Sequence, residues 1–334
     1  MNTILSSAFA ETFDKNGNKV SLPGEFPALP ISEEMRQYVP TPHKEYTFRK
    51  GELRTILSFL ARPHGSGFFL FGPTGSGKTS LVEEVAARLG WPVFSVTLNE
   101  RMELTDLRGS WVYEQSGEGS TPVMRFLSGP ALKAFAEGGI LLMNEVDVAS
   151  PGILSGLNDL IEGRSIYVPE LKKQINPHPL FRVIATANSS GQGDETGAYS
   201  GVQSQNCALF NRMRSMQVGY PTEEVERELV SKVFQTEGLS ANDARSFATD
   251  MVALATRVRA ESTALKGIDG TLSCVLSTRN LVTWAKVALD YAACPGCNFL
   301  KAGLEEVLLN RASEADRTAI TSYCQAIFGS HWAE

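Results

Sequence analysis

Residues 72–80, GPTGSGKTS, constrain the fold of this chain more than any other stretch of its sequence. They match G-x-x-x-x-G-K-[ST], a pattern that forms a phosphate-binding loop where a strand precedes it and a helix follows it. Both neighbours are predicted, because GFFLF at 67–71 is a short apolar run and KTSLVEEVAARLG at 78–90 has the apolar spacing of an amphipathic helix. In such a loop the backbone N–H groups surround phosphate oxygens, the lysine reaches the β- and γ-phosphates, and the next hydroxyl binds Mg²⁺. The residues predicted to form this nucleotide site are Gly72, Pro73, Thr74, Gly75, Ser76, Gly77, Lys78, Thr79 and Ser80.

Short apolar runs alternate with helical patterns between residues 67 and 220, which predicts an α/β fold with a parallel sheet flanked by helices. The predicted strands are 67–71, 92–98, 140–143 and 181–188. From Thr222 onward the pattern is helical. We therefore expect an irregular N-terminal arm at 1–38, an α/β nucleotide-binding domain at 39–221 and an all-helical lid domain at 222–334. With 334 residues and 43% hydrophobic content, the chain is long enough for more than one core.

The third and fourth predicted strands end in polar residues that suit metal and water chemistry. In phosphate-loop proteins that hydrolyse nucleotides, one such strand ends in an acidic residue that holds Mg²⁺, and the next glutamate polarises the attacking water. In GILLMNEVDVAS at 139–150, Asn144 occupies the metal position and Glu145 the base position. Asn188, which closes the fourth strand, is predicted to orient the water or to contact the γ-phosphate.

Three arginines are candidates for stabilising charge on a transferred phosphoryl group. LFNRMRS at 209–215 places Arg212 and Arg214 at the rim of the α/β part, where either could reach the nucleotide of a neighbouring subunit. Arg279 follows a Ser277/Thr278 capping signal and is predicted in the first turn of a helix. A cation is unfavourable for the helix dipole at that position, so we expect Arg279 to bind phosphate.

The order of these elements resembles the AAA+ ATPases. The spacers TDLRGSW, FLSGPALKAFAEGGILL, LNDLIEGRS and NPHPLFRVIATAN resemble the MoxR-type branch of that family. VPTPHKEYTF, GQGDETGAYSGVQSQN and STRNLVTWA resemble the AAA+ subunits of aerobic cobaltochelatases within that branch. The resemblance covers roughly residues 38–330. It implies ATP and Mg²⁺ as cofactors, a homo-oligomeric ring that is usually a hexamer, and a partner with a von Willebrand A domain. It also implies two hairpins inserted in the core, at about 110–126 and 164–178, which we expect to line or cap a central pore.

Two positions depart from the family pattern. Asn144 replaces an aspartate at the metal position, and Asn211 replaces the aspartate that usually precedes the arginine at 212. An amide oxygen can still accept a hydrogen bond from a metal-bound water, but it lacks the charge. The sequence thus predicts weaker Mg²⁺ binding and a slow but active Mg-dependent ATPase. Asp147 would restore the charge if the chain stayed extended, because its side chain would then point the same way as that of Glu145.

The target of such a motor stays open at this stage. A chelatase-like complex, a different protein activated through a von Willebrand A partner, and a non-hydrolysing scaffold that assembles on ATP are all compatible with the residues. ATP and GTP are not distinguished either, although we expect the base to lie between 39–48 and the helix near Arg279.

Composition disfavours several other functions. A net charge of −6 disfavours binding to a nucleic-acid backbone. Five irregularly spaced cysteines, including one CxxC at 294–297, predict neither a disulfide framework nor a zinc site. No apolar run approaches the ~20 residues of a membrane helix, so we expect a cytoplasmic protein.

Overall fold

The computed structural model describes residues 2–114, 122–191, 207–266, 270–294 and 296–332. Its centre is a five-stranded parallel sheet with the strand order β13-β5-β12-β9-β6. These strands are β5 (Gly67–Phe71), β6 (Val93–Thr97), β9 (Gly139–Asn144), β12 (Phe181–Ala187) and β13 (Met213–Gln217). Every residue of β9 and β12 is buried, which explains the apolar run of β9 and the mostly apolar sequence of β12. The predicted α/β fold with a parallel sheet is confirmed, and β13 is an additional edge strand that the sequence did not predict.

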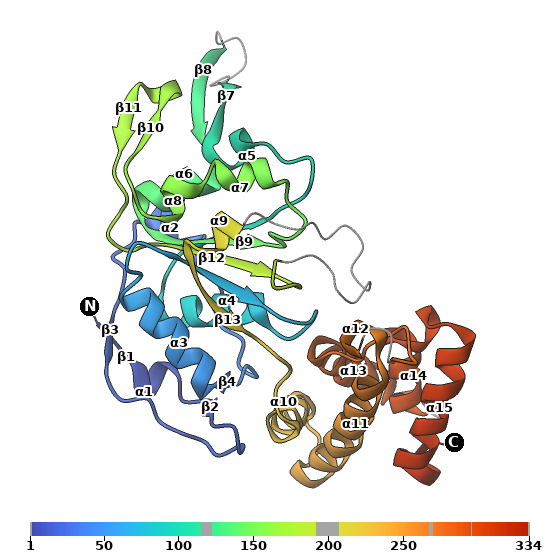
Figure 1. The fold of residues 1–334 in the computed structure, drawn as a ribbon. Coiled ribbons are helices and arrows are strands. Elements are labelled where there is room, and N and C mark those ends of the chain that lie inside the picture. The colour runs from blue at the N-terminus through green and yellow to red at the C-terminus, as the bar shows by residue number, and fades with distance from the viewer. Residues whose placement is uncertain (1, 115–121, 192–206, 267–269, 295, 333–334) are drawn as a thin grey trace.

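Helices cover both faces of the sheet (Figure 1). Phe68 and Leu70 of β5 point into one cluster together with α3 and α4, whereas Phe69 belongs to the cluster on the other face. This alternation is the period-two pattern of a strand buried on both sides. The helices of the first face are α3 (Lys50–Ala61) and α4 (Lys78–Leu89). Those of the second face and its loops are α5 (Leu104–Arg108), α6 (Pro130–Glu137), α7 (Pro151–Ser155), α8 (Asn158–Ile161) and α9 (Cys207–Phe210).

The N-terminal residues are not the irregular arm that their composition suggested. They form short elements, and Phe9 and Phe26 are buried in the cluster that also contains α3, α4 and β5. Large apolar side chains removed from water fix this segment to the body despite its few regular hydrogen bonds. The elements are β1 (Asn2–Ile4), α1 (Leu5–Ala8), β2 (Thr12–Phe13), β3 (Glu25–Pro27), α2 (Glu33–Arg36) and β4 (Phe48–Arg49).

The C-terminal helices have a hydrophobic cluster of their own, centred on the fully buried Trp284. In Figure 1 they lie beside the body, with α10 between the sheet and the remaining helices. The helices are α10 (Glu223–Thr236), α11 (Ala241–Glu261), α12 (Thr263–Lys266), α13 (Thr278–Tyr291), α14 (Phe299–Val307) and α15 (Glu314–Phe328). The fold therefore combines a helix-flanked parallel sheet with an all-helical C-terminal region, as predicted. No helix among the described residues is long and apolar enough to cross a membrane.

Two antiparallel hairpins project from the body at the end opposite the lid helices (Figure 1). The first pairs β7 (Gly109–Glu114) with β8 (Val123–Ser128), and the second pairs β10 (Ile166–Val168) with β11 (Lys173–Ile175). The tip of the first hairpin, 115–121, lies outside the described residues, as does 192–206, which carries most of the GQGDETGAYSGVQSQN motif.

Candidate nucleotide site

The loop that follows β5 can close only because glycines occupy two of its positions. Gly72 has φ +148°, and a Cβ there would lie 2.2 Å from the carbonyl oxygen of Val218. Gly75 has φ +68°, and a Cβ there would lie 2.4 Å from the Ser277 hydroxyl of the lid. The chain then enters α4 at Lys78, so the loop ends at a helix N-terminus, where N–H groups and the dipole favour a phosphate.

Lys78 is held at the mouth of this loop. Its Nζ donates to the carbonyl oxygens of Gly72 (2.8 Å) and Pro73 (2.9 Å) and to Asn188 Oδ1 (3.1 Å). Burial lowers the pKa of Lys78 to about 8, with Arg279 adding to the effect and the carboxylates of Asp147 and Glu145 opposing it. An anion bound in the loop would favour the charged ammonium. Lys78 is therefore placed to bind phosphate at neutral pH.

Asn144 sits in a network of hydroxyl groups at the end of β9. Its Oδ1 accepts from Thr79 Oγ1 (2.8 Å) and Thr186 Oγ1 (3.0 Å), and its Nδ2 donates to Ser95 Oγ (3.0 Å). The oxygen of the amide thus faces Thr79, the residue expected to bind the metal. Amide and hydroxyl oxygens are the hard ligands that Mg²⁺ prefers. Thr79 and Asn144 together fit a Mg²⁺ ion, with the ligand charge to be supplied by phosphates.

Glu145 is exposed, and its φ of +57° is uncommon for a residue other than glycine. The chain therefore leaves the extended conformation at this residue. As a result Asp147 does not point the same way as Glu145: Asp147 is fully buried, and its Oδ2 accepts from the backbone N–H groups of Asn188 (2.9 Å) and Ser189 (3.2 Å). The premise that the chain stays extended from Glu145 to Asp147 is therefore wrong. Asp147 does not replace the charge missing at 144 but fixes the end of β12.

One cavity brings most of the predicted site residues together. It is lined by the loop residues Thr74, Gly75 and 77–80, by Asn144, Glu145 and Asn188, and by Arg279 of the lid. Arg279 lies in the first turn of α13, between Ser277 and Asn280, which form a capping box. Its backbone N–H donates to the carbonyl oxygen of Gly75 (3.3 Å), so the lid contacts the phosphate loop directly. The strand ends, the loop and the lid therefore converge on one site.

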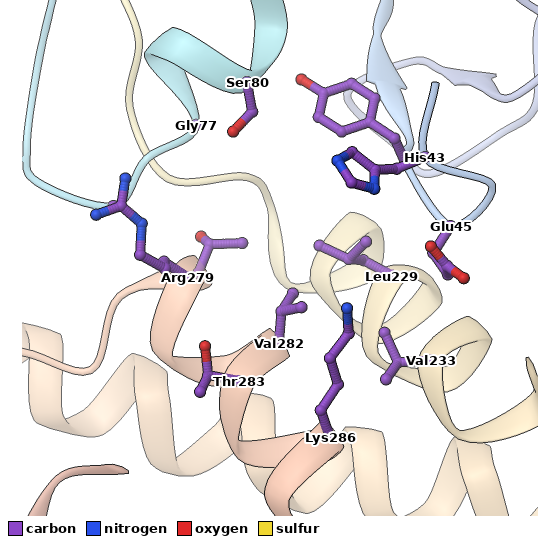
Figure 2. Close-up of a pocket in the computed structure, with 13 residues that line it drawn as sticks. His43, Glu45, Gly77, Ser80, Leu229, Val233, Arg279, Val282, Thr283 and Lys286 are labelled. Carbon is purple, nitrogen blue, oxygen red and sulfur yellow. The ribbon is translucent and has the colours of Figure 1, made fainter. Parts of the chain in front are cut away.

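An adjoining cavity of about 280 Å³ extends from the loop between the body and the lid (Figure 2). The two cavities share Gly75, Gly77, Ser80 and Arg279. The remaining lining residues, which the sequence did not identify one by one, are His43, Glu45, Tyr46, Leu229, Val233, Thr278, Val282, Thr283 and Lys286. Two pairs of these residues are spaced i, i+4 on one helix: Leu229 with Val233 on α10, and Val282 with Lys286 on α13. This spacing is the only feature of the sequence that places them on a common helix face.

The segment at 43–46 is fixed to the phosphate-loop helix. Glu84 of α4 accepts the backbone N–H of His43 (2.9 Å), and Arg88 donates to the His43 carbonyl oxygen (2.9 Å). Burial raises the pKa of Glu84, whereas the hydrogen bond from His43 and the nearby Arg88 lower it. The cavity thus has one wall tied to α4 and another formed by the lid.

Arg212 and Arg214 do not line either cavity. Arg212 precedes β13, its carbonyl oxygen accepts from the N–H of Gly67 at the start of β5, and its Nε lies 2.6 Å from Glu162 Oε1. β13 begins beside the start of β5, whereas the phosphate loop follows the end of β5. Arg212 therefore lies at the end of the strands opposite the phosphate loop. Arg214 lies over the rings of Phe59 and Phe68, at 5.8 and 5.9 Å from their centroids. In these positions neither arginine reaches the nucleotide site of its own chain.

Comparison with known proteins gives similarities in sequence and in structure. Residues 67–201 match the family model described as AAA domain (dynein-related subfamily). Residues 67–201 thus form an AAA-type domain. It is 29% identical to the aerobic cobaltochelatase subunit CobS of a Sinorhizobium species over 304 residues, which are 90% of this chain and 86% of that protein. It is 37% identical to midasin of Dictyostelium discoideum over 123 residues, 36% of this chain but only 2% of that protein. A crystal structure of NtrX from Brucella abortus matches with a TM-score of 0.45 and 16% identity over 82% of this chain and 59% of that one.

Proposed function

We propose that this AAA+ chain is a Mg²⁺-dependent ATPase that hydrolyses ATP in the cavity between the phosphate loop and Arg279. The observation that carries the proposal is the convergence of Lys78, Asn144, Glu145, Asn188 and Arg279 on that one cavity. These residues come from the loop, from two strand ends and from the lid. Their types match the needs of phosphoryl transfer, namely cations for the phosphates, oxygen ligands for a metal and a carboxylate for water.

Each side chain has a distinct role in the proposed reaction. Lys78 and Arg279 neutralise the β- and γ-phosphates. Glu145, which is exposed to solvent at the cavity, accepts a hydrogen bond from the attacking water, and Asn188 orients that water. The water oxygen bonds to the γ-phosphorus while the bond from that phosphorus to the β–γ bridging oxygen breaks, giving ADP, phosphate and a proton. Mg²⁺, held through Thr79 and Asn144, supplies further positive charge to the phosphates when bound.

The cavity of about 280 Å³ beside the loop supports binding of the base there. Leu229, Val233 and Val282 supply apolar surface, and the segment at 43–46 supplies the polar side chains of His43 and Glu45. We propose ATP as the nucleotide. Calorimetric titration with MgATP and MgGTP tests this choice, and a tighter or equal affinity for MgGTP would contradict it.

We propose further that the chain assembles into a ring, usually a hexamer in this family, and that Arg212 reaches the nucleotide of the neighbouring subunit. Arg212 lies at the end of the strands opposite the phosphate loop, and this position supports a role at the site of a neighbouring subunit rather than at its own. Mass photometry with and without MgATP tests assembly, and a chain that stays monomeric at saturating MgATP would refute it.

The similarity to a cobaltochelatase subunit supports a motor that remodels or activates a partner complex through a von Willebrand A protein. Exposed apolar side chains on the first hairpin give this proposal a physical basis: Trp111 is 48%, Tyr113 76% and Met124 51% exposed. Purification of the native protein with and without ATP tests it. Co-elution of a large corrin-binding subunit would indicate a chelatase complex, co-elution of a von Willebrand A protein alone would indicate another target, and the absence of both would contradict the proposal.

Asn144 is the one observation that favours a non-hydrolysing scaffold over a motor, because it lacks the charge expected at the metal position. The network around Asn144 supports slow turnover instead, since its oxygen still faces Thr79.

A further inference from the structure

We infer that Tyr220, Arg259 and Glu226 form a positioning unit that couples the phosphate loop to Arg279. This inference rests on the proposed function, because it assigns these residues to the placement of a side chain that would bind nucleotide. None of the three lines the cavity at the phosphate loop. They would act through Arg279 rather than on the nucleotide.

Glu226 joins three lid helices through one carboxylate. It lies on α10 and is fully buried. Arg259 of α11 donates to both of its oxygens, at 2.7 and 2.9 Å. The hydroxyl of Thr278, at the start of α13, donates to Glu226 Oε1. Since a buried charge without partners is costly, the ion pair with Arg259 and the hydrogen bond from Thr278 fix the relative positions of the three helices.

The same arginine connects the lid to the phosphate loop. The Arg259 guanidinium carbon lies 4.1 Å from the centroid of the Tyr220 ring, and the Tyr220 hydroxyl donates to the carbonyl oxygen of Thr74 (2.8 Å). Arg259 Nε also donates to the Leu276 carbonyl oxygen (2.7 Å), just before α13 begins. A chain of direct contacts therefore runs from the loop residue Thr74 to the first turn of α13.

Arg279 is the residue on which these contacts act. It directly follows Thr278, which is bound to Glu226, and its own N–H donates to Gly75 of the loop. The start of α13 is thus held from the lid side and from the loop side. A side chain placed in advance loses less entropy when it binds a phosphate, which strengthens binding without a new ligand contact. We infer that this is the contribution of the unit.

Tyr220→Phe tests the inference with one atom removed. The ring that Arg259 contacts stays, and the hydrogen bond from the hydroxyl to Thr74 is lost. Tyr323→Phe is the matched control: Tyr323 also lies under an arginine of α11, with Arg257 at 4.0 Å from its ring centroid, and its hydroxyl also donates one hydrogen bond, to Glu261. That stack lies against α15, away from the phosphate loop.

We would measure the dissociation constant of MgATP for the wild type, both variants, Arg279→Ala, and Arg279→Ala combined with each. Tyr220→Phe is expected to weaken MgATP binding about fivefold, the typical value of one hydrogen bond. In the Arg279→Ala background the same change should have no effect, and Tyr323→Phe should have none in either background. Melting temperatures show whether each variant is folded.

Equal weakening by Tyr220→Phe with and without Arg279 would overturn the positioning role, as would equal effects of the two tyrosine variants. A second pair, Arg259→Lys and Arg257→Lys, repeats the comparison: lysine at 259 cannot bind both oxygens of Glu226, so only that variant should raise the dissociation constant. A wild-type protein that fails to bind MgATP would instead refute the proposed function itself.

Discussion

Asn144→Asp is the change that tests the chemistry of the site most closely. In the structure the amide oxygen of Asn144 accepts from Thr79 and Thr186, and its nitrogen donates to Ser95. An aspartate keeps the first two hydrogen bonds, and the Ser95 hydroxyl can rotate to donate to the new oxygen. The substitution therefore adds one negative charge with almost no change in shape or in the number of partners.

The expected change in Mg²⁺ binding depends on whether the side-chain oxygen at position 144 is neutral or charged. A hydrogen bond to a charged acceptor is stronger than one to a neutral acceptor by about 1 kcal/mol, which is about fivefold in a binding constant. Asn144 is only 9% exposed, so solvent screens the added charge little. We expect the Mg²⁺ concentration that gives half-maximal ATP hydrolysis to fall about fivefold and the turnover at low Mg²⁺ to rise.

Phosphate release measured over a series of MgCl₂ concentrations checks this prediction. Asn176→Asp is a suitable control, because Asn176 also accepts from a hydroxyl, that of Ser165, but lies beside the second hairpin. It should leave the Mg²⁺ requirement unchanged. If Asn144→Asp leaves the half-maximal Mg²⁺ concentration unchanged or raises it, the assignment of residue 144 to the metal is wrong.

Three further predictions follow from the placement of other groups. Because Lys78 has a pKa of about 8 and must be charged to attract phosphate, MgATP affinity should fall by up to about tenfold between pH 7 and pH 9, and binding should take up a proton. Lys78→Arg should abolish this pH dependence, and calorimetry in two buffers measures the affinity and the proton uptake. Arg212→Ala should bind MgATP normally but lose about 10³-fold in turnover, and mixing it with Glu145→Gln should restore part of the activity if Arg212 acts in trans; no recovery in mixed rings would argue against that role. Deleting 110–126 should leave ATP binding and assembly intact while removing stimulation by the partner, and unchanged stimulation would show that the first hairpin does not engage the target.

The phosphate loop and the sheet could be predicted because their signals are local. The pattern at 72–80 needs only its own strand and helix, and β9 and β12 are mostly apolar segments that suit strands buried on both faces. The edge strand β13 was not predicted, since MRSMQ is half polar and contacts a single neighbouring strand. Edge strands carry a weak hydrophobic pattern because one side meets solvent.

The parts of the site that join distant segments were less accessible to sequence reasoning. The cavity beside the loop combines residues from 43–46, α10 and α13. The sequence predicted that the base lies between 39–48 and the helix of Arg279, but it did not predict the contribution of α10. The orientation of Asp147 depends on the positive φ of Glu145, which alternation along an extended strand does not anticipate. The N-terminal segment lacks long periodic runs, yet Phe9 and Phe26 are buried and β2 pairs with β4, so distant contacts hold it to the body.

The most direct test of the account compares phosphate release from saturating MgATP by the wild type and by Glu145→Gln. Glutamine keeps the size and hydrogen-bonding oxygen of Glu145 but cannot accept a proton from water, so binding should be unchanged while turnover falls about 10²-fold or more. A wild-type rate above background that collapses in Glu145→Gln, with equal MgATP affinity for both proteins, is the predicted result. Equal measurable rates for the two proteins would contradict the assignment of this site as an ATPase centre. Background rates for both proteins, even with the partner present, would contradict it as well.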